Sequence, residues 1–108
     1  MIDIETTVMT LLLHAGEARS CAMHALQYAR EQNWGEAQQA LNAADNAARE
    51  AHKIQTQLIG EDEGAGKLPV TLILVHAQDH LMNAMLCRDL AGEIIALRQQ
   101  IWQASPAA

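Results

Sequence analysis

The chain has 108 residues, of which 13 are acidic and seven basic, so its formal net charge at pH 7 is −6. The negative net charge argues against the basic surface that binds nucleic acid or an anionic membrane. It favours a partner with a basic face. Phe is absent and alanine is the commonest apolar residue, so a core built from this chain gains modest free energy per residue but lets helices approach closely.

Cysteine spacing and the N-terminal segment indicate the compartment. Cys21 and Cys87 stand far apart and match no metal-ligand or redox spacing, which favours a reducing environment. The segment Met1-Ile-Asp-Ile-Glu5 lacks the basic region and apolar run of a secretory signal. No window approaches the roughly 20 continuous apolar residues of a membrane span. We therefore expect a soluble cytoplasmic protein.

Hydrophobic periodicity predicts three long helices, over about residues 3–32, 35–59 and 69–103. Breaks are expected at 32–35, at Gly60 with the acidic, glycine-rich segment 61–66, and before Pro69, which suits a first helical position. Short connections predict an all-α fold, an antiparallel up-down three-helix bundle in a single domain over residues 1–108. The seam of the first helix is Ile4, Val8, Leu11, Ala15, Ala18, Ala22, Ala25 and Ala29, and that of the second is Ala37, Leu41, Ala44, Ala48, Ala51, Gln55 and Leu58.

The third predicted helix carries more apolar surface than one chain can cover. A helix in a monomeric bundle needs an apolar arc of little more than 100°, and here three neighbouring stripes are apolar. The surplus predicts self-association, with the third helices packed around a symmetry axis. The stripes are Leu74, Ala77, Leu81, Ala84 and Ile95; Leu72, Val75, Met82 and Leu86 with Asp79; and Ile73, Leu90, Ile94, Leu97 and Ile101 with His76, His80, Asn83 and Cys87.

Three titratable residues interrupt this apolar helix on one face. At about 100° per residue, Asp79 lies roughly 60° to one side of His76, and His80 lies roughly 40° to the other. Titratable groups that converge on an apolar surface are costly unless they bind or react with something. The segment 75–82 is therefore the candidate site.

His76 has three interpretations from its chemistry alone. It is a core histidine satisfied by a neighbour, or half of a His i, i+4 pair that binds a transition metal, or a nucleophile that accepts a phosphoryl group. Ala77 replaces the glutamate of the H-E-x-x-H protease motif, so hydrolysis of that kind is excluded.

The residues alone leave the choice between metal binding and nucleophilic catalysis open. The sequence has no glycine-rich loop ahead of a helix and no lysine placed to hold phosphates, so a phosphoryl group would come from another protein. The alternative from a different class is an oligomeric helical metal-binding scaffold without phosphotransfer.

Several short motifs are similar to one known family. They are Ala15-Gly16-Glu17-Ala18-Arg19-Ser20, Glu50-Ala51-His52 with Gln55-Thr56, and His76-Ala77-Gln78-Asp79-His80-Leu81-Met82. With three helices of suitable length, the chain resembles, from about Ile4 to Trp102, the IIA component of the lactose/cellobiose/N,N'-diacetylchitobiose branch of the bacterial sugar phosphotransferase system.

This resemblance implies a role for His76. That residue matches the phosphorylated histidine of the family, which accepts phosphate from the histidine phosphocarrier protein and passes it to a cysteine of the cognate IIB component. IIB then supplies the phosphate to sugar that enters through the membrane component IIC. The form Val75-His76-Ala77 favours a β-linked disaccharide of the cellobiose/chitobiose type over lactose.

The resemblance also implies a homotrimer. Asp79 matches a carboxylate that meets its two symmetry mates on the threefold axis around a divalent cation, with magnesium the expected ion because three carboxylates repel one another. Gln78 lies about 200° around the helix from His76, so we hypothesise that it points at the histidine of the next subunit. His80 is expected to support the phosphorylated residue. His52 is expected to pack or hydrogen-bond, and His14 and His24 are given no role.

Overall fold

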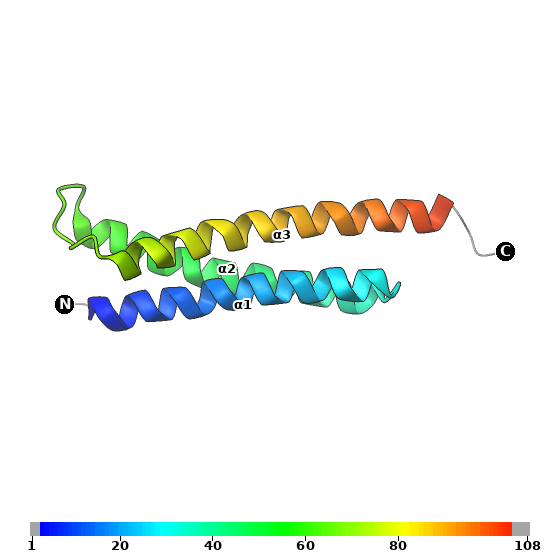
Figure 1. The fold of residues 1–108 in the computed structure, drawn as a ribbon, viewed down its shortest axis with the longest axis horizontal. Coiled ribbons are helices and arrows are strands. Elements are labelled where there is room, and N and C mark those ends of the chain that lie inside the picture. The colour runs from blue at the N-terminus through cyan, green and yellow to red at the C-terminus, as the bar shows by residue number, and fades with distance from the viewer. Residues whose placement is uncertain (1–2, 105–108) are drawn as a thin grey trace.

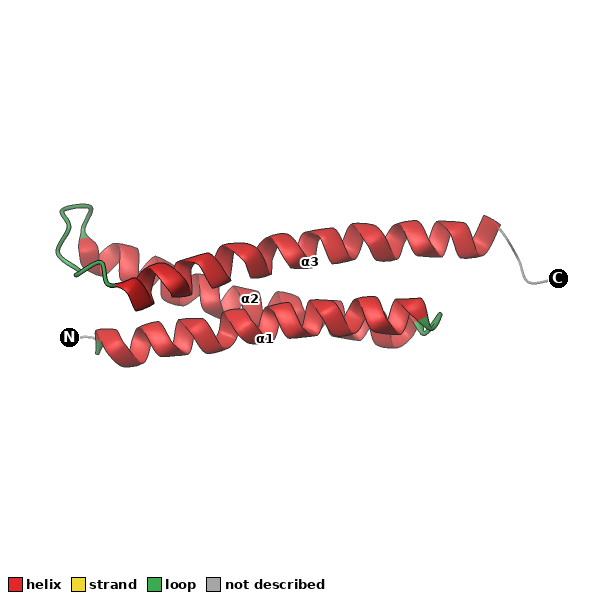
Figure 2. Cartoon of the chain, in the orientation of Figure 1, coloured by secondary structure: helices red, strands yellow, loops and turns green. Residues whose placement is uncertain are grey.

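The computed structural model describes residues 3–104, which form three α-helices and no strand (Figure 1, Figure 2). The helices are α1 (Ile4–Arg30), α2 (Trp34–Asp62) and α3 (Leu72–Ala104). They run up, down and up in an elongated bundle of 63 × 19 × 19 Å. The predicted all-α, antiparallel three-helix bundle is confirmed. No helix in the described residues is long and apolar enough to cross a membrane.

The start of α1 and the α1–α2 turn are closed by local hydrogen bonds. Asp3 caps α1 by accepting from the hydroxyl (2.7 Å) and the backbone N–H (3.4 Å) of Thr6, and these bonds lower the pKa of the Asp3 carboxyl. At the other end, the N–H of Asn33 donates to the Tyr28 carbonyl at 2.9 Å. Gln32 adopts the left-handed conformation that this helix ending requires, with φ of 59°. The turn joins α1 and α2 within three residues.

Two helix boundaries differ from the prediction. α2 continues through Gly60 to Asp62, because the Asp62 carboxylate accepts from the N–H groups of Gly66 (3.3 Å) and Leu68 (2.9 Å) and so organises the loop. α3 begins at Leu72 and not at Pro69, because Thr71 is the better cap: its hydroxyl oxygen accepts from the backbone N–H three residues on, at 3.2 Å.

The core between the helices is narrow because it consists mainly of alanine. Twelve of the 18 buried apolar side chains in the described residues are alanines, and the largest that are fully buried are Leu11, Leu81 and Val8. At mid-length, the cluster of buried residues between the three helices consists of Ala18, Ala47 and Ala84. The predicted seams of α1 and α2 are buried except that Ile4, Ala48 and Gln55 are half-buried, and Ala47 takes the inner position beside Ala48.

α3 packs mainly on α1, and its opposite face is uncovered. α1 contacts both other helices along its length, whereas α2 and α3 contact each other much less. Figure 1 shows the C-terminal end of α3 extending past the α1–α2 turn. Of the three apolar stripes, the one with Ala77, Leu81 and Ala84 faces the core. The other two remain exposed, with Leu72, Met82 and Leu97 more than half accessible.

An ion pair joins α2 to α3 where their contact is sparse. The Arg88 guanidinium donates to both carboxylate oxygens of Asp45, through Nε at 2.5 Å and Nη2 at 3.1 Å, and this bond raises the pKa of Arg88. A Cβ at Gly92 would lie 2.5 Å from Nη1 of the same guanidinium. Gly92 therefore leaves the space in which Arg88 reaches across to α2.

We predict that Asp45→Asn lowers the free energy of unfolding by about 1 kcal/mol, because it leaves a partly buried guanidinium short of its charged partner. Urea denaturation at one fixed protein concentration measures the change. The control is Glu50→Gln, which breaks an exposed pair with Lys53 (3.2 Å) on α2 and should change stability by less than about 0.5 kcal/mol. Equal losses in both variants would contradict a special role for the α2–α3 pair.

Candidate functional site

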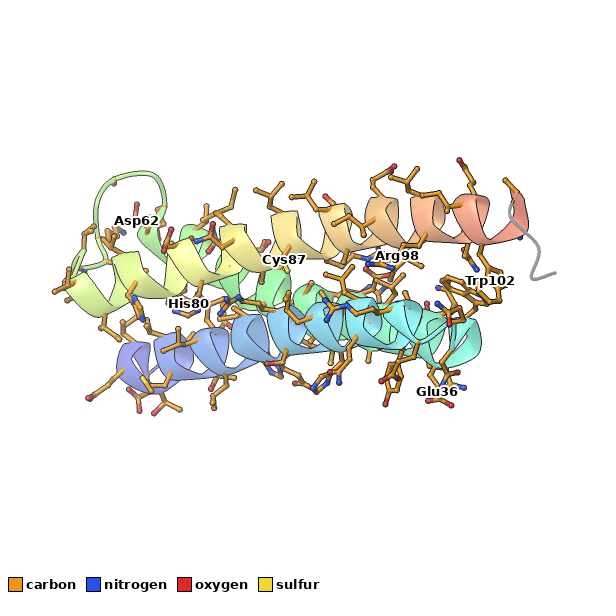
Figure 3. All side chains as sticks on the ribbon, turned by 45° about the vertical axis from the view of Figure 1, so that its right-hand side comes forward. Glu36, Asp62, His80, Cys87, Arg98 and Trp102 are labelled. Atoms are coloured by element: carbon orange, nitrogen blue, oxygen red, sulfur yellow. The ribbon has the colours of Figure 1, made fainter. Side chains whose placement is uncertain are left out.

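The predicted cluster of titratable residues lies near the start of α3, on the side away from the core. Ala77 and Leu81 on the inner side are buried in the apolar cluster that includes residues of α1 and α2. This packing leaves His76 and Asp79 exposed and His80 half-buried. Figure 3 shows the side chain of His80 on the side of α3 that faces α1. The core contacts of the helix therefore determine which of the three groups is most accessible.

The two imidazole rings are in contact. The ring centroids of His76 and His80 are 4.4 Å apart and the ring planes meet at 73°, an edge-to-face arrangement. The half-buried ring of His80 therefore lies against the exposed ring of His76. His76 combines solvent access with a contact on one side, an arrangement open to large partners.

Apolar side chains surround His76. Leu72, Ile73 and Val75 line an open recess together with His76 and Asp79. The three apolar side chains are all exposed, Leu72 to 86% of its surface. Exposed apolar groups beside a polar reactive centre are typical of a protein-docking surface, where they are covered on binding and exclude water.

Asp79 is exposed and holds one hydrogen bond. Asn83, one turn further along α3, donates from Nδ2 to Oδ1 of Asp79 at 3.1 Å. Within residues 3–104 of one chain, no group of three or more His, Cys, Asp or Glu side chains converges in a way that could hold a metal ion. A carboxylate is a suitable ligand for a hard divalent cation, but one chain supplies a single one here. The donor set fits such a cation only where several copies meet.

Gln78 lies on a different side of α3 from His76. It is half-buried and lines a pocket with Leu58 and Asp62 of α2 and with Leu68 of the α2–α3 loop. The structure therefore does not bring Gln78 and the histidine together within one chain.

The remaining histidines lie away from this cluster. His24 and His52 are exposed on α1 and α2. His52 was expected to pack or hydrogen-bond, and its exposure shows that it does not pack in the core. His14 is half-buried, with Nδ1 3.9 Å from a carboxylate oxygen of Glu17 on the same helix.

Both cysteines are unpaired thiols. Burial, and secondarily the nearby charge of Glu17, raises the pKa of the Cys21 thiol, so it is a weak nucleophile. Cys87 lies with its sulfur 3.8 Å from that of Met23. Neither cysteine joins the histidine cluster.

Two polar residues, Asn83 and Gln55, were named in the sequence patterns but given no role. The bond from Asn83 to Asp79 follows from their spacing of four residues, which places them on the same helix face. Gln55 has a buried Oε1 without a hydrogen-bond partner in the described chain. The position of this glutamine inside an otherwise apolar seam could have predicted a buried polar atom here.

A helical bundle that presents one open histidine among exposed apolar side chains has the arrangement expected of a phosphocarrier protein. Residues 6–99 match the family described as the lactose/cellobiose-specific IIA subunit of the PTS system. The chain is 43% identical over 99 residues to the N,N'-diacetylchitobiose-specific EIIA component of Escherichia coli, an alignment that covers 92% of this chain and 85% of that protein.

Solved structures agree with this match. The cellobiose-specific enzyme IIA from Bacillus anthracis has a TM-score of 0.88 and 42% identity, over 94% of this chain and 93% of that one. The IIA(chitobiose) component in its complex with HPr, from Escherichia coli, has a TM-score of 0.81 and 42% identity, over 94% and 98%. The chain belongs to the lactose/cellobiose-specific IIA family of the phosphotransferase system, and it is a phosphotransferase relay protein.

Proposed function

We propose that His76 is the residue that carries the phosphoryl group, and that it receives this group from HPr, the histidine phosphocarrier protein. His76 then passes the group to a cysteine of the cognate IIB component, which supplies sugar entering through the membrane component IIC. The single observation that carries the proposal is the exposure of this imidazole beside Leu72, Ile73 and Val75. Two different proteins must reach the same nitrogen in turn, and a buried histidine could not serve both.

The chemistry requires only a neutral ring nitrogen at His76. Its lone pair attacks the phosphorus of the donor phosphohistidine, a new N–P bond forms, and the donor's N–P bond breaks to release the donor imidazole. In the second transfer the IIB thiolate attacks the same phosphorus, and the bond to His76 breaks. The edge-to-face contact with His80 holds the accepting ring in place during both steps, and we assign His80 this supporting role.

The charge of the chain supports partners with basic surfaces. A net charge of −6 attracts a basic protein over several ångströms and raises its rate of association. The complex of the similar chitobiose component with HPr supports HPr as the donor. A role between a soluble phosphate donor and a membrane sugar component suits a cytoplasmic location. The chitobiose- and cellobiose-specific relatives support a β-linked disaccharide of that type as the sugar.

We further propose that three copies assemble through α3. Its uncovered stripes place many large apolar side chains in water, a pattern that soluble monomers rarely show. Three copies packed around one axis would cover them and would bring three Asp79 side chains together. The exposed apolar residues of α3 are Leu72, Ile73, Val75, Met82, Met85, Leu86, Leu90, Ile94, Leu97, Ile101 and Trp102.

Three Asp79 carboxylates on one axis would hold a divalent cation, for which magnesium is the expected ion. The carboxylates repel one another in a dry interface, and neutralisation by a hard cation or by shared protons is required for all three to be buried there. Such a cation would supply charge neutralisation for the three carboxylates. In the same assembly Gln78 of one copy would approach His76 of its neighbour, which would couple the active site to assembly.

The first test is phosphorylation itself. On incubation with phosphoenolpyruvate, enzyme I and HPr, the protein should gain an acid-labile, alkali-stable phosphate. His76→Ala should lose at least 99% of this label, whereas His24→Ala, which removes another exposed histidine, should keep it. A wild-type protein that takes no label but binds zinc stoichiometrically would favour the scaffold alternative.

A chelator should weaken the trimer through Asp79. We expect EDTA to raise the concentration at which the wild type dissociates at least tenfold in sedimentation equilibrium experiments. Because the dissociation constant of a trimer varies with the square of that concentration, this shift is equivalent to about 2.7 kcal/mol per trimer. Asp79→Asn should be insensitive to EDTA because its side chains carry no charge. Asp89→Asn, an exposed carboxylate of α3 outside the uncovered stripes, should respond like the wild type. An unchanged wild type in EDTA would contradict the shared cation.

Gln78→Ala should stay trimeric and accept phosphate from HPr about tenfold more slowly, because the next subunit's histidine loses a polar neighbour worth about 1.4 kcal/mol in the transition state. Rapid-quench labelling measures the rate. Gln100→Ala, on the exposed part of α3, is the matched control and should react normally. A trimeric Gln78→Ala protein with a normal rate would remove the assignment.

A further inference from the structure

One hydrogen-bonded polar pair interrupts the uncovered apolar face of α3. Asp79 and Asn83 lie one turn apart on this face, joined by the bond of 3.1 Å from Nδ2 of Asn83 to Oδ1 of Asp79. Both side chains are exposed in the single chain. Their neighbours along the face are apolar and also exposed, with Met82 at 62%, Leu86 at 56% and Leu90 at 52%.

The apolar residues of this face do not by themselves determine one alignment between copies. They follow one another at steps of three or four residues, except between Val75 and Met82, where Asp79 fills the step. A slip of four residues, about 6 Å, still sets Met82, Leu86, Leu90 and Leu97 at the levels of Leu86, Leu90, Ile94 and Ile101. The same slip places Val75 at the level of Asp79. The apolar positions are Leu72, Val75, Met82, Leu86, Leu90, Ile94, Leu97 and Ile101.

We infer that Asn83 determines the register in which parallel α3 helices of separate copies pack, by holding Asp79 in a polar layer within the apolar interface. The inference rests on the proposed assembly through α3. Among parallel arrangements, only the in-register one brings the polar layers of all copies to the same level. A shifted parallel register sets the carboxylate or the amide against apolar side chains such as Val75 or Leu86.

The energies support this assignment. A polar group buried without a partner costs roughly 1–3 kcal/mol, and an unpaired charge costs more. In a shifted register the two side chains keep their bond to each other, but the Asp79 charge is buried without the polar groups of the other copies. A single polar residue in an apolar helix interface is known to select register and oligomer state at some loss of stability. The bond to Oδ1 restrains the carboxylate and leaves Oδ2 free toward the axis.

The simpler explanation is an ordinary helix surface pair. Pairs four residues apart add about 0.2–0.5 kcal/mol to a helix and have no wider effect. The chain contains such a pair on α2, where Gln38 donates from Nε2 to Oδ1 of Asn42 at 3.0 Å. Asn42 is exposed among polar residues and lies outside the apolar face. It is therefore the matched control.

The experiment compares the wild type, Asn83→Leu and Asn42→Leu in two measurements. Sedimentation equilibrium gives the number of copies, and the ¹H–¹⁵N NMR spectrum gives the number of distinct environments per amide. We expect the wild type and Asn42→Leu to form one species with a single set of peaks. Asn83→Leu should dissociate at a concentration at least tenfold lower than the wild type, yet form several species or several sets of peaks. Asn83→Gln, which keeps the amide donor, should restore a single species.

The outcomes separate this inference from the proposed function. If the wild type is trimeric and Asn83→Leu forms the same single trimer with one set of peaks, the register role is wrong while the assembly and the phosphocarrier role stand. If Asn42→Leu also becomes heterogeneous, the effect is not specific to the apolar face and the inference is again wrong. A monomeric wild type would overturn both the inference and the assembly, but phosphorylation of His76 would still be measured independently.

Discussion

The structure depends on one constraint, which is that α3 is apolar on two opposite sides while the chain covers only one of them. The inner side is lined by Ala77, Ala84 and Ala91, so α3 approaches α1 closely but buries little area per residue. The larger apolar side chains of α3 lie outward, where neither α1 nor α2 reaches them. A bundle of this kind gains modest stability from its own core, and its largest unused source of stabilisation is the surface that another molecule can cover.

The location of His76, the proposed phosphate carrier, follows from the same constraint. His76 lies between the covered and uncovered sides of α3, so its ring is open to partners while His80, slightly nearer to α1, restrains it. A residue further toward the core would be inaccessible, and one at the centre of the uncovered face would be buried in an assembly. Asp79 occupies that central position. The exposed histidine and the centre of the uncovered face are thus separated by a rotation of about 60° around one helix.

The sequence predicted what depends on periodicity and missed what depends on particular side-chain contacts. The three helices, the inner stripe of α3 and the exposure of its other stripes follow from spacings of three and four residues. The end of α2 was wrong because a carboxylate at Asp62 stabilises the loop more effectively than Gly60 disrupts the helix. The start of α3 was wrong because Thr71 caps it. The pairing of Arg88 with Asp45 could not be predicted, since it joins positions 43 residues apart.

The spacing of the uncovered face also bears on how copies can pack. From Leu72 to Ile101 the face repeats at about 3.6 residues, close to the period of a straight α-helix, whereas a left-handed coiled coil requires 3.5. Such a stripe runs nearly parallel to the helix axis, so α3 helices of several copies can stay in contact over their full length without supercoiling. The part of α3 beyond the α1–α2 turn would then be covered only by its counterparts (Figure 1). In the proposed assembly the shared face and His76 would therefore lie on one helix, and a change that shifts α3 within that interface would also move His76 relative to the copy beside it.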